Sequence, residues 1–411
     1  MSGLRRSASG SKVRVVYVAK VKLENVRGFH DARRVDLDLA RTDHDSYAGW
    51  TVVVGHNGSG KTTLLRAIAL ALAGPEACRT LAGDAASWVS AGRERGGVEL
   101  DLVGGLYVGL TLSSDGIEVE SNIARADFLC VGYGPYRRLG GGTALTQSGA
   151  LARLAGLFRE DLSLSESVTW LIGQHQRAQE KRPGAAEVRA AVLAVLGDGL
   201  LPGVIDPADL QVAIREMGEA DRTMAAMVID LLRHMHQAYG RLDLDPERPA
   251  VTAPGVVLID EVEAHLHPVW QQRLGQWLKR HFPAVQFLVT TNSPLVCQAA
   301  DPRGLIRLPA PDEQRAPYVV EDDLYRRVVF GSAEDVLLSD LFEVDSPYSP
   351  QARLLRQELV DLELKVLDGK ASEIQLARYR ELQELLVSSP AARALEIEAR
   401  LVREKARRGS R

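Results

Sequence analysis

The residues best suited to chemistry in this 411-residue chain form one short segment, Gly55-His56-Asn57-Gly58-Ser59-Gly60-Lys61-Thr62, which matches GxxxxGK[ST] in full. Glycines permit a tight loop whose backbone N–H groups converge on phosphate oxygens. In such a loop the lysine reaches the β- and γ-phosphates, and the hydroxyl that follows it binds Mg²⁺. The spacing therefore predicts a phosphate-binding loop (P-loop), with Lys61 on the phosphates and Thr62 on the metal.

The residues on both sides of this segment predict the strand and the helix that a P-loop requires. The apolar run Trp50–Val54 predicts a strand, and the Leu- and Ala-rich run Thr62–Ala73 predicts a helix. A helix N-terminus carries partial positive charge, so this helix directs its favourable end at the bound anion. Thr63, in the first helical turn, joins the eight loop residues as a predicted cofactor-binding residue.

An acidic pair much later in the chain gives the second chemical signal. The fully apolar run Gly255–Ile259 predicts a central parallel strand, and Asp260 and Glu261 follow it directly. Such a pair can be an ordinary solvated turn. Together with a P-loop it forms the Walker B pattern, in which Asp260 completes the Mg²⁺ site and Glu261 orients or deprotonates the attacking water. The predicted metal ligands are therefore Thr62 and Asp260.

Five segments of the sequence resemble those of the ABC-type AAA family ATPases that include RecF, the SMC heads and the OLD proteins. They are KLENVRGFHD, GHNGSGKTTLLRAIALALAG, VGYGPYRR, VLIDEVEAHLHPVWQQRL and FLVTTNSPLVCQA, within Val13–Val344. The ATPase subunits of Septu-type anti-phage systems belong to the same group. The resemblance implies that the ligands are ATP and Mg²⁺. It also implies a homodimer in which each ATP lies between the P-loop of one subunit and the signature segment of the other, with Glu263 near the partner.

Two sites depart from the family pattern. The best match to the LSxG-type signature is Met217–Thr223, where Gly218 replaces the serine and Ala220 replaces the glycine. Asn292 stands where the family usually carries a histidine that senses the γ-phosphate, and asparagine can donate a hydrogen bond but carries no charge. Losing one such contact costs about 2–4 kcal/mol of transition-state stabilisation. We therefore expect Lys61, Glu261 and Asn292 to serve a slow hydrolysis.

The order of the predicted strands and helices indicates an α/β fold, a P-loop ABC-ATPase head. Strands lie on both sides of a long helical stretch, and one core with an inserted lobe explains this more simply than consecutive domains. We expect a flexible tail at 1–12, an ATPase core at 13–143 and 241–346, an inserted helical lobe with the degenerate signature at 144–240, and a C-terminal helical extension at 347–411.

An antiparallel β subdomain is predicted within the core. A hairpin over Val13–Leu39 has Gly28 at its turn, and alternating runs follow at Gly97–Val103 and Tyr107–Leu112. An irregular, glycine-rich stretch is expected at Gly132–Gly142. The remaining predictions are one strand, Gln286–Thr291, and the helices Ala150–Phe158, Ser165–Glu180, Ala186–Leu196, Ala220–Tyr239, Pro268–His281, Gln351–Gly369, Ala371–Leu386 and Ala391–Arg408.

Composition argues against several other classes of protein. The net charge of −4 provides no global basic field for nucleic acid. Three widely spaced cysteines without a CxxC pattern favour a reducing cytosol over a disulfide framework or a zinc site. His265 and His267 are only two residues apart, so a structural or interface role is favoured over a metal site. No apolar run reaches the roughly 18 residues of a membrane span, and we expect a cytoplasmic protein without a membrane partner.

Three functions remain open at this stage. The leading hypothesis is an ATP-driven dimeric switch that controls a separate effector, such as a nuclease or toxin, in anti-phage defence. The second is a RecF-like ATPase that binds DNA during repair. The third is a scaffold that binds ATP without turnover, which Gly218, Ala220 and Asn292 encourage.

Overall fold

The computed structural model describes residues 16–39, 47–123, 128–137, 139, 143, 149–200 and 216–386. The chain divides into two compact units, Met1–Phe342 and Glu343–Arg411. The tail predicted at 1–12 and the helix predicted at Ala391–Arg408 lie outside the described residues.

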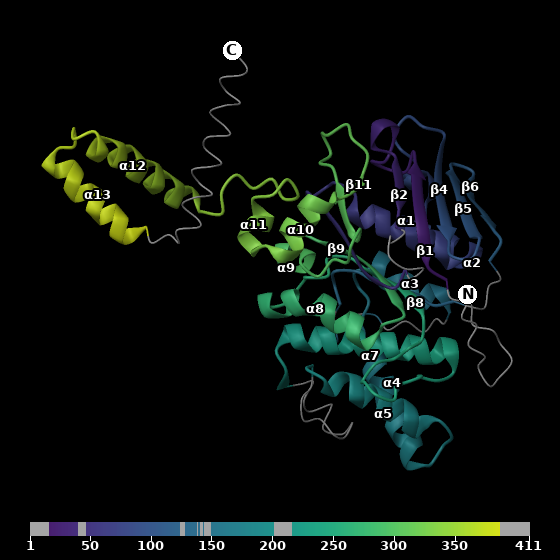
Figure 1. Ribbon diagram of the computed structural model, residues 1–411. Helices are drawn as coiled ribbons and strands as arrows, with labels where there is room; N and C mark the ends of the chain where they lie inside the picture. Colours follow the sequence, from purple (N-terminus) through teal and green to yellow (C-terminus); the bar gives the residue numbers. More distant parts are fainter. Residues whose placement is uncertain are drawn as a thin grey trace. The chain divides into compact units, whose positions relative to one another are not determined.

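A six-stranded sheet forms the centre of the first unit (Figure 1). Its strand order is β11-β10-β3-β9-β8-β7, and all neighbours are parallel except the antiparallel pair β10–β11. The strand predicted at Gly255–Ile259 is confirmed as β8, with partners on both sides. The other strands of this sheet are β3 (Gly49–Gly55), β7 (Cys130–Tyr133), β9 (Val285–Thr291), β10 (Leu305–Leu308) and β11 (Tyr318–Val319).

Both faces of this sheet are covered, which explains why its strands are apolar without alternation. Successive side chains of a strand point to opposite faces. Val53 accordingly lies in one buried cluster, while Val52 and Val54 lie in the other. The helix α1 (Lys61–Ala73), which follows the P-loop, fills the first cluster.

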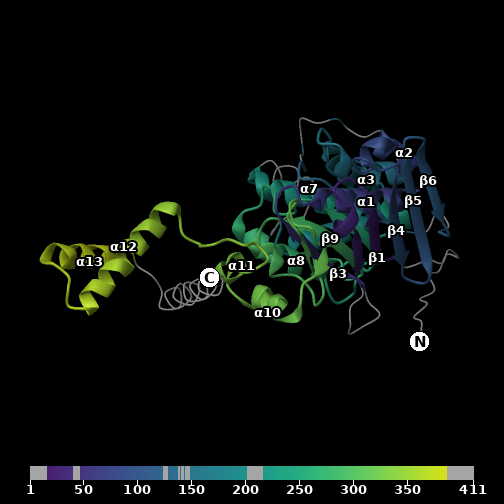
Figure 2. The ribbon, with the colours of Figure 1, turned by 90° about the horizontal axis from the view of Figure 1, so that it is seen from above.

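A second, antiparallel sheet covers α1 from the other side (Figures 1 and 2). Its order is β2-β1-β4-β5-β6, which confirms the predicted β subdomain. The turn of the first hairpin lies at Arg27 and Gly28, and Arg27 carries the left-handed backbone there, with φ 50°. The strands are β1 (Val18–Glu24), β2 (Val35–Asp38), β4 (Arg95–Leu102), β5 (Leu106–Ser113) and β6 (Gly116–Ser121).

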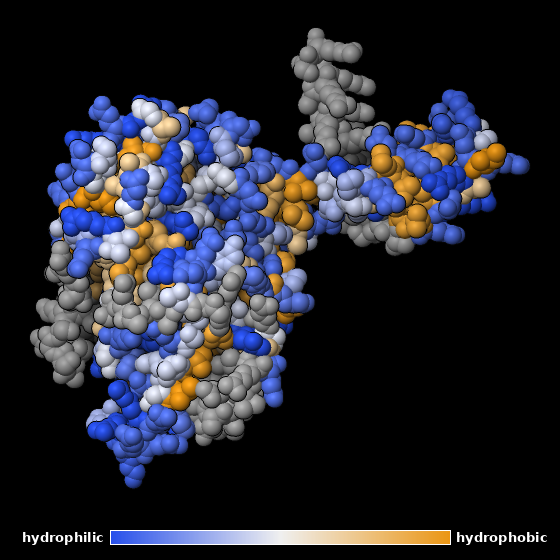
Figure 3. Space-filling view, turned by 180° about the vertical axis from the view of Figure 1, so that it is seen from behind, coloured by the Kyte–Doolittle hydropathy of each residue, from blue (hydrophilic) through white to orange (hydrophobic). Residues whose placement is uncertain are grey.

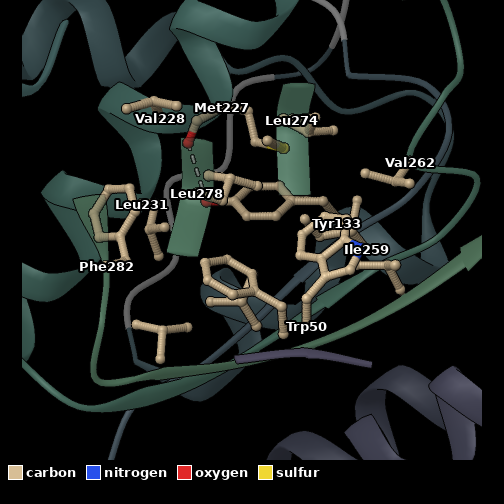
Figure 4. Packing of buried hydrophobic residues seen from close by; sticks show 14 of the residues in the cluster. Trp50, Tyr133, Met227, Val228, Leu231, Ile259, Val262, Leu274, Leu278 and Phe282 are labelled. Carbon is tan, nitrogen blue, oxygen red and sulfur yellow. Dashed lines mark hydrogen bonds between the residues drawn. The ribbon is translucent and has the colours of Figure 1, made fainter. Parts of the chain in front are cut away.

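Helices cover the opposite face of the parallel sheet. Residues of α7 (Glu219–Tyr239) and α8 (Pro268–His281) share one buried cluster with Trp50, Tyr133 and Ile259 of the strands (Figure 4). The helices α4 (Ser165–Gln179) and α5 (Ala185–Gly197) add to the same cluster. The first and last helices of residues 144–240, α3 and α7, thus pack within the two core clusters, and a separate lobe there remains a prediction.

The irregular stretch predicted at Gly132–Gly142 is wrong at its start, because Gly132 and Tyr133 belong to the strand β7. A Cβ on Gly132 would lie 3.1 Å from Cβ of Leu157 in α3 (Ala150–Phe158), so the glycine permits close packing of that helix. Residues 138 and 140–142 lie outside the described part of the chain. The remaining short elements of this unit are η1 (Asp31–Arg33), α2 (Pro75–Ala82), η2 (Ala85–Trp88), α9 (Pro294–Cys297), α10 (Asp322–Phe330) and α11 (Ala333–Leu337).

The second unit contains two of the predicted helices, α12 (Pro350–Leu367) and α13 (Glu373–Leu385). Leu359, Leu362 and Leu382 form a small core between them. Figure 3 shows hydrophobic surface on this unit. Its exposed apolar side chains are Leu354, Leu364, Leu367, Ile374 and Leu385. Within the described residues, no helix combines the length and apolar character needed to cross a membrane.

Candidate nucleotide-binding site

The P-loop connects the end of β3 to the start of α1, as the sequence predicts. Gly58 and Gly60 have φ of 83° and 103°, in the left-handed region that glycine adopts without steric cost. A Cβ on Gly60 would also lie 2.6 Å from the ring of Phe29. Glycine is therefore required at position 60 for two reasons: its positive φ, and the close approach of the Phe29 ring.

The N-terminal hairpin supports the P-loop through Arg33, which sequence reasoning did not single out. The guanidinium is buried and donates to the carbonyls of Ser59 (3.3 Å) and Glu313 (2.9 Å). It also donates to the carbonyls of Pro309 and Ala310 in the segment after β10. Arg33 thus joins three segments that are distant in sequence, and it fixes one side of the loop.

Lys61 is the first residue of α1 and its side chain folds back across the loop. The ammonium donates to the carbonyl oxygens of Gly55 (2.6 Å) and His56 (3.2 Å). Burial lowers the pKa of Lys61, and the carboxylates of Glu261, Glu263 and Asp260 partly offset that effect. The ammonium therefore lies among carbonyl and carboxylate oxygens, where it can bind phosphate oxygens.

Thr62 and Asp260 meet where α1 begins and β8 ends. The Thr62 hydroxyl donates to Oδ2 of Asp260 over 2.7 Å, and Thr290 of β9 donates to Oδ1 over 2.5 Å. Asp260 is 2% exposed, so these bonds fix both of its oxygens. Mg²⁺ binds through one or two protein oxygens, with waters and phosphate oxygens completing the octahedron. Thr62 and Asp260 fit that ligand set, and Mg²⁺ bound there would neutralise phosphate charge.

Glu261 occupies a strained backbone position directly after Asp260. Its φ is 45°, and its N–H donates to the hydroxyl of Thr290 over 2.8 Å. Burial raises the pKa of Glu261, and repulsion from Asp260 and Glu263 adds to that rise. A carboxylate with a raised pKa is a better general base near neutral pH. The site thus brings together the predicted residues Lys61, Thr62, Asp260 and Glu261.

Asn292 follows the end of β9 and its side chain is exposed. Its backbone N–H donates to Oε1 of Glu263 over 2.6 Å, and Thr291 donates to Oε2 over 2.6 Å. Glu263, which the resemblance placed near a partner subunit, therefore holds the end of β9 within its own chain.

Two family models match parts of the chain. One is described as an AAA domain and matches residues 20–111. The other is described as "AAA domain, putative AbiEii toxin, Type IV TA system" and matches residues 161–298. The two matches include the P-loop, the Walker B strand and Asn292.

The curated relatives point the same way. The chain is 25% identical to a Septu protein PtuA from Bacillus mycoides (strain KBAB4), over 74% of this chain and 42% of that protein. It is 27% identical to a "Retron Ec83 probable ATPase" from Escherichia coli, over 47% of this chain and 37% of that protein. Together these matches support an ABC-type ATPase related to those of anti-phage defence. The match spans less than half the length of both relatives.

Two solved structures align with this chain over about three quarters of its length. An SMC head bound to the C-terminal winged-helix domain of ScpA shows 15% identity over 74% of this chain and 97% of that chain, with a TM-score of 0.44. The recombination mediator protein RecF, in a structure with ATPrS, shows 12% identity over 75% of this chain and 99% of that chain, with a TM-score of 0.40.

The segment predicted to be a degenerate signature, Met217–Thr223, lies at the start of α7. Gly218 is the N-cap of this helix. The backbone N–H of Arg222 donates to the carbonyl of Gly218 (3.0 Å), and the Arg222 guanidinium donates to the carbonyl of Met217 (2.9 Å). A Cβ on Gly218 would meet Oδ2 of Asp221 at 4.0 Å, an ordinary contact. The backbone would thus accept the serine of the family pattern at this position.

A buried polar network connects α7 to β7, and sequence reasoning did not find it. The hydroxyl of Tyr133 donates to Oδ2 of Asp230 over 3.1 Å, and Arg233 donates to Oδ1 over 2.7 Å. His234 and Glu166 complete the network. Burial alone would raise the pKa of Asp230, but His234 and Arg233 outweigh it and lower the pKa below its usual value.

The two histidines after Glu263 lie in the segment between β8 and α8. His267 caps α8, since its Nδ1 accepts from the N–H of Val269 over 3.3 Å. His265 takes a left-handed backbone with φ 65°. In the described residues, no group of three His, Cys, Asp or Glu side chains is placed to hold a metal ion.

Proposed function

We propose that this ATPase binds Mg²⁺·ATP at the P-loop and hydrolyses it slowly. In this proposal two heads associate around the nucleotide, and that association controls a separate effector in anti-phage defence. The observation that carries the proposal is the meeting of Thr62 with Asp260, which brings the Walker A and Walker B segments together.

Each residue of the site has a defined task in this proposal. Lys61 and the loop N–H groups would bind the phosphates, while Thr62 and Asp260 would hold the ion. Glu261 would orient the attacking water and accept its proton, and its raised pKa suits that task. Positioning and charge neutralisation supply most of the acceleration in phosphoryl transfer.

Slow turnover follows from the contacts that the chain lacks. Gly218 offers no hydroxyl to a γ-phosphate across a dimer, and Asn292 offers no positive charge. Each missing contact is worth about 2–4 kcal/mol, or about 30-fold to 10³-fold in rate. At such a site ATP stays bound for a long time before it is hydrolysed. That property suits a switch better than a motor.

The defence role rests on relatives of the Septu and retron type. A Septu-like arrangement implies a separate nuclease or toxin as the effector. The match spans less than half the length of each relative, so we propose such a partner for this chain and do not transfer it from them.

Phosphate release under steady-state and single-turnover conditions tests the proposal. The wild type should hydrolyse ATP slowly, Glu261→Gln should bind ATP with turnover lowered at least about 100-fold, and Lys61→Ala should lose ATP binding. Bound ATP without any wild-type hydrolysis would instead indicate a scaffold. DNA binding that requires ATP and weakens steeply with salt would favour the repair function.

A further inference from the structure

Arg137 is a buried cation beside the turn Asp260–Ala264, which carries Glu261. The proposed function gives Arg137 no task. Arg137 follows β7 by four residues, and its side chain packs against the segment Asp260–Ala264. The residue is 4% exposed. Burying a guanidinium is costly unless its N–H groups are bonded, so its position calls for an explanation.

The guanidinium of Arg137 donates to five backbone carbonyls. One nitrogen, Nη1, reaches Gly134 (2.9 Å) and Asp260 (3.1 Å). The other, Nη2, reaches Glu261 (3.2 Å), Val262 (3.2 Å) and, more weakly, Ala264 (3.4 Å). Four of the five acceptors belong to the turn that carries Glu261.

Four carbonyl oxygens of that turn point towards one place, and a cation there stabilises their partial negative charges. Glu261 has a left-handed backbone, which strains a residue with a Cβ by about 1–3 kcal/mol. Such a conformation persists only where the surroundings determine it. A planar guanidinium can bond several convergent carbonyls at once, whereas an ammonium cannot match that geometry.

We propose that Arg137 is a positioning residue, which fixes the backbone of the Asp260–Ala264 turn and thereby aims the Glu261 carboxylate at the attacking water. The inference rests on the proposed ATP hydrolysis. Arg137 acts through backbone carbonyls, and none of its five hydrogen bonds reaches Lys61, Thr62 or the P-loop, so its task differs from holding the phosphates.

Two consequences distinguish positioning from general support of the fold. Loss of the guanidinium should lower kcat and leave the affinity for Mg²⁺·ATP nearly unchanged, because the P-loop contacts remain. Its effect should also depend on Glu261, because a turn that no longer carries the base gains little from being held in place.

The test is a double-mutant cycle of Arg137→Lys and Glu261→Gln, measured by single-turnover hydrolysis of labelled ATP. We expect Arg137→Lys to lower the rate about 10–100-fold, as loss of an orienting contact commonly does. In the Glu261→Gln background the same change should lower the rate less than about threefold. Methylguanidinium added to Arg137→Ala should restore part of the rate.

Arg307→Lys provides a matched control, since Arg307 is a second buried arginine, 3% exposed, in β10. Both lysine variants should lose comparable thermal stability, while Arg307→Lys retains turnover within about twofold. Equal rate losses for Arg137→Lys in both backgrounds, or an unchanged rate in the wild-type background, would overturn the inference. An absence of wild-type hydrolysis would overturn the proposed function and, with it, this inference.

Discussion

The hydroxyl of Thr62 donates a 2.7 Å hydrogen bond to the carboxylate of Asp260, a residue 198 positions away in the sequence. This bond joins the first turn of α1 to the tip of β8. Thr290 holds the other carboxylate oxygen, so Asp260 cannot turn away from Thr62 without losing that contact. The pair is therefore arranged in advance to share one cation.

Asp260→Asn should separate metal binding from nucleotide binding. The amide keeps the size of the side chain but loses the charge that a hard cation prefers. We expect ATP binding in the presence of EDTA to change little, while the gain in affinity from added Mg²⁺ falls at least about tenfold. Calorimetric titrations with Mg²⁺ and with EDTA measure both quantities. Thr62→Ser, which keeps a hydroxyl, is the control, and a normal Mg²⁺ effect in Asp260→Asn would contradict the assignment.

Turnover should rise when the family residues are restored. Gly218→Ser adds a hydroxyl at a position with room for it, and Asn292→His adds a group that can carry charge. Each change should raise the steady-state rate of the proposed dimer by up to about 10²-fold. If phosphate-release assays show brisk wild-type turnover that neither substitution changes, the slow-switch account is wrong.

Asp230→Ala should destabilise the first unit strongly. The substitution leaves Tyr133, Arg233 and His234 without their shared acceptor in a buried site. Breaking such a network by removing one partner costs about 3–5 kcal/mol of unfolding free energy. Urea denaturation measures the loss, and Asp115→Ala in the exposed turn after β5 serves as the control, with an expected change within about 0.5 kcal/mol. Similar losses for both variants would refute the special role of Asp230.

Stability should decrease below about pH 6.5, the ordinary pKa of histidine. Burial lowers the pKa of His281, which packs on Trp277, although the Trp277 carbonyl and Asp198 oppose the shift. The folded state therefore binds this proton less readily than the unfolded state. The contribution of neutral His281 to the unfolding free energy is complete above the pKa of this histidine in the unfolded state. It is lost as the pH falls towards the lower pKa of His281 in the folded state.

Thermal or urea unfolding between pH 7.5 and 5.5 tests this sign. The unfolding free energy of the wild type should fall by up to about 1.4 kcal/mol per pH unit for this proton. His281→Gln should show a smaller slope, and the burial of His236, which also lowers its pKa, accounts for part of what remains. An identical slope in the variant would show that His281 does not carry the effect.

The sequence predicted those features that depend on residues close together in the chain. The P-loop, the strand before Asp260 and the helix Pro268–His281 each combine a hydrophobic pattern with local end signals, and the structure has all three. The short strands β10 and β11 were not predicted, because four and two residues hold too little pattern.

The residues that support the site were harder to predict. Arg33, Arg137 and Thr290 act on backbone or side chains that are distant in sequence, and their partners depend on the order of strands in the sheet. Nothing in the segment VGYGPYRR shows that the first of its two arginines, Arg137, will donate to five carbonyls. Their residue types favoured such roles, but only the fold could show which acceptors they reach.

Sedimentation of Glu261→Gln with and without Mg²⁺·ATP tests the central claim most directly. If bound ATP joins two heads, this variant should shift to a heavier species with ATP, return to the lighter one when ATP is removed, and shift more completely than the wild type. Lys61→Ala should sediment as without nucleotide. A Glu261→Gln protein that binds ATP by calorimetry and yet sediments identically with and without it would contradict the account.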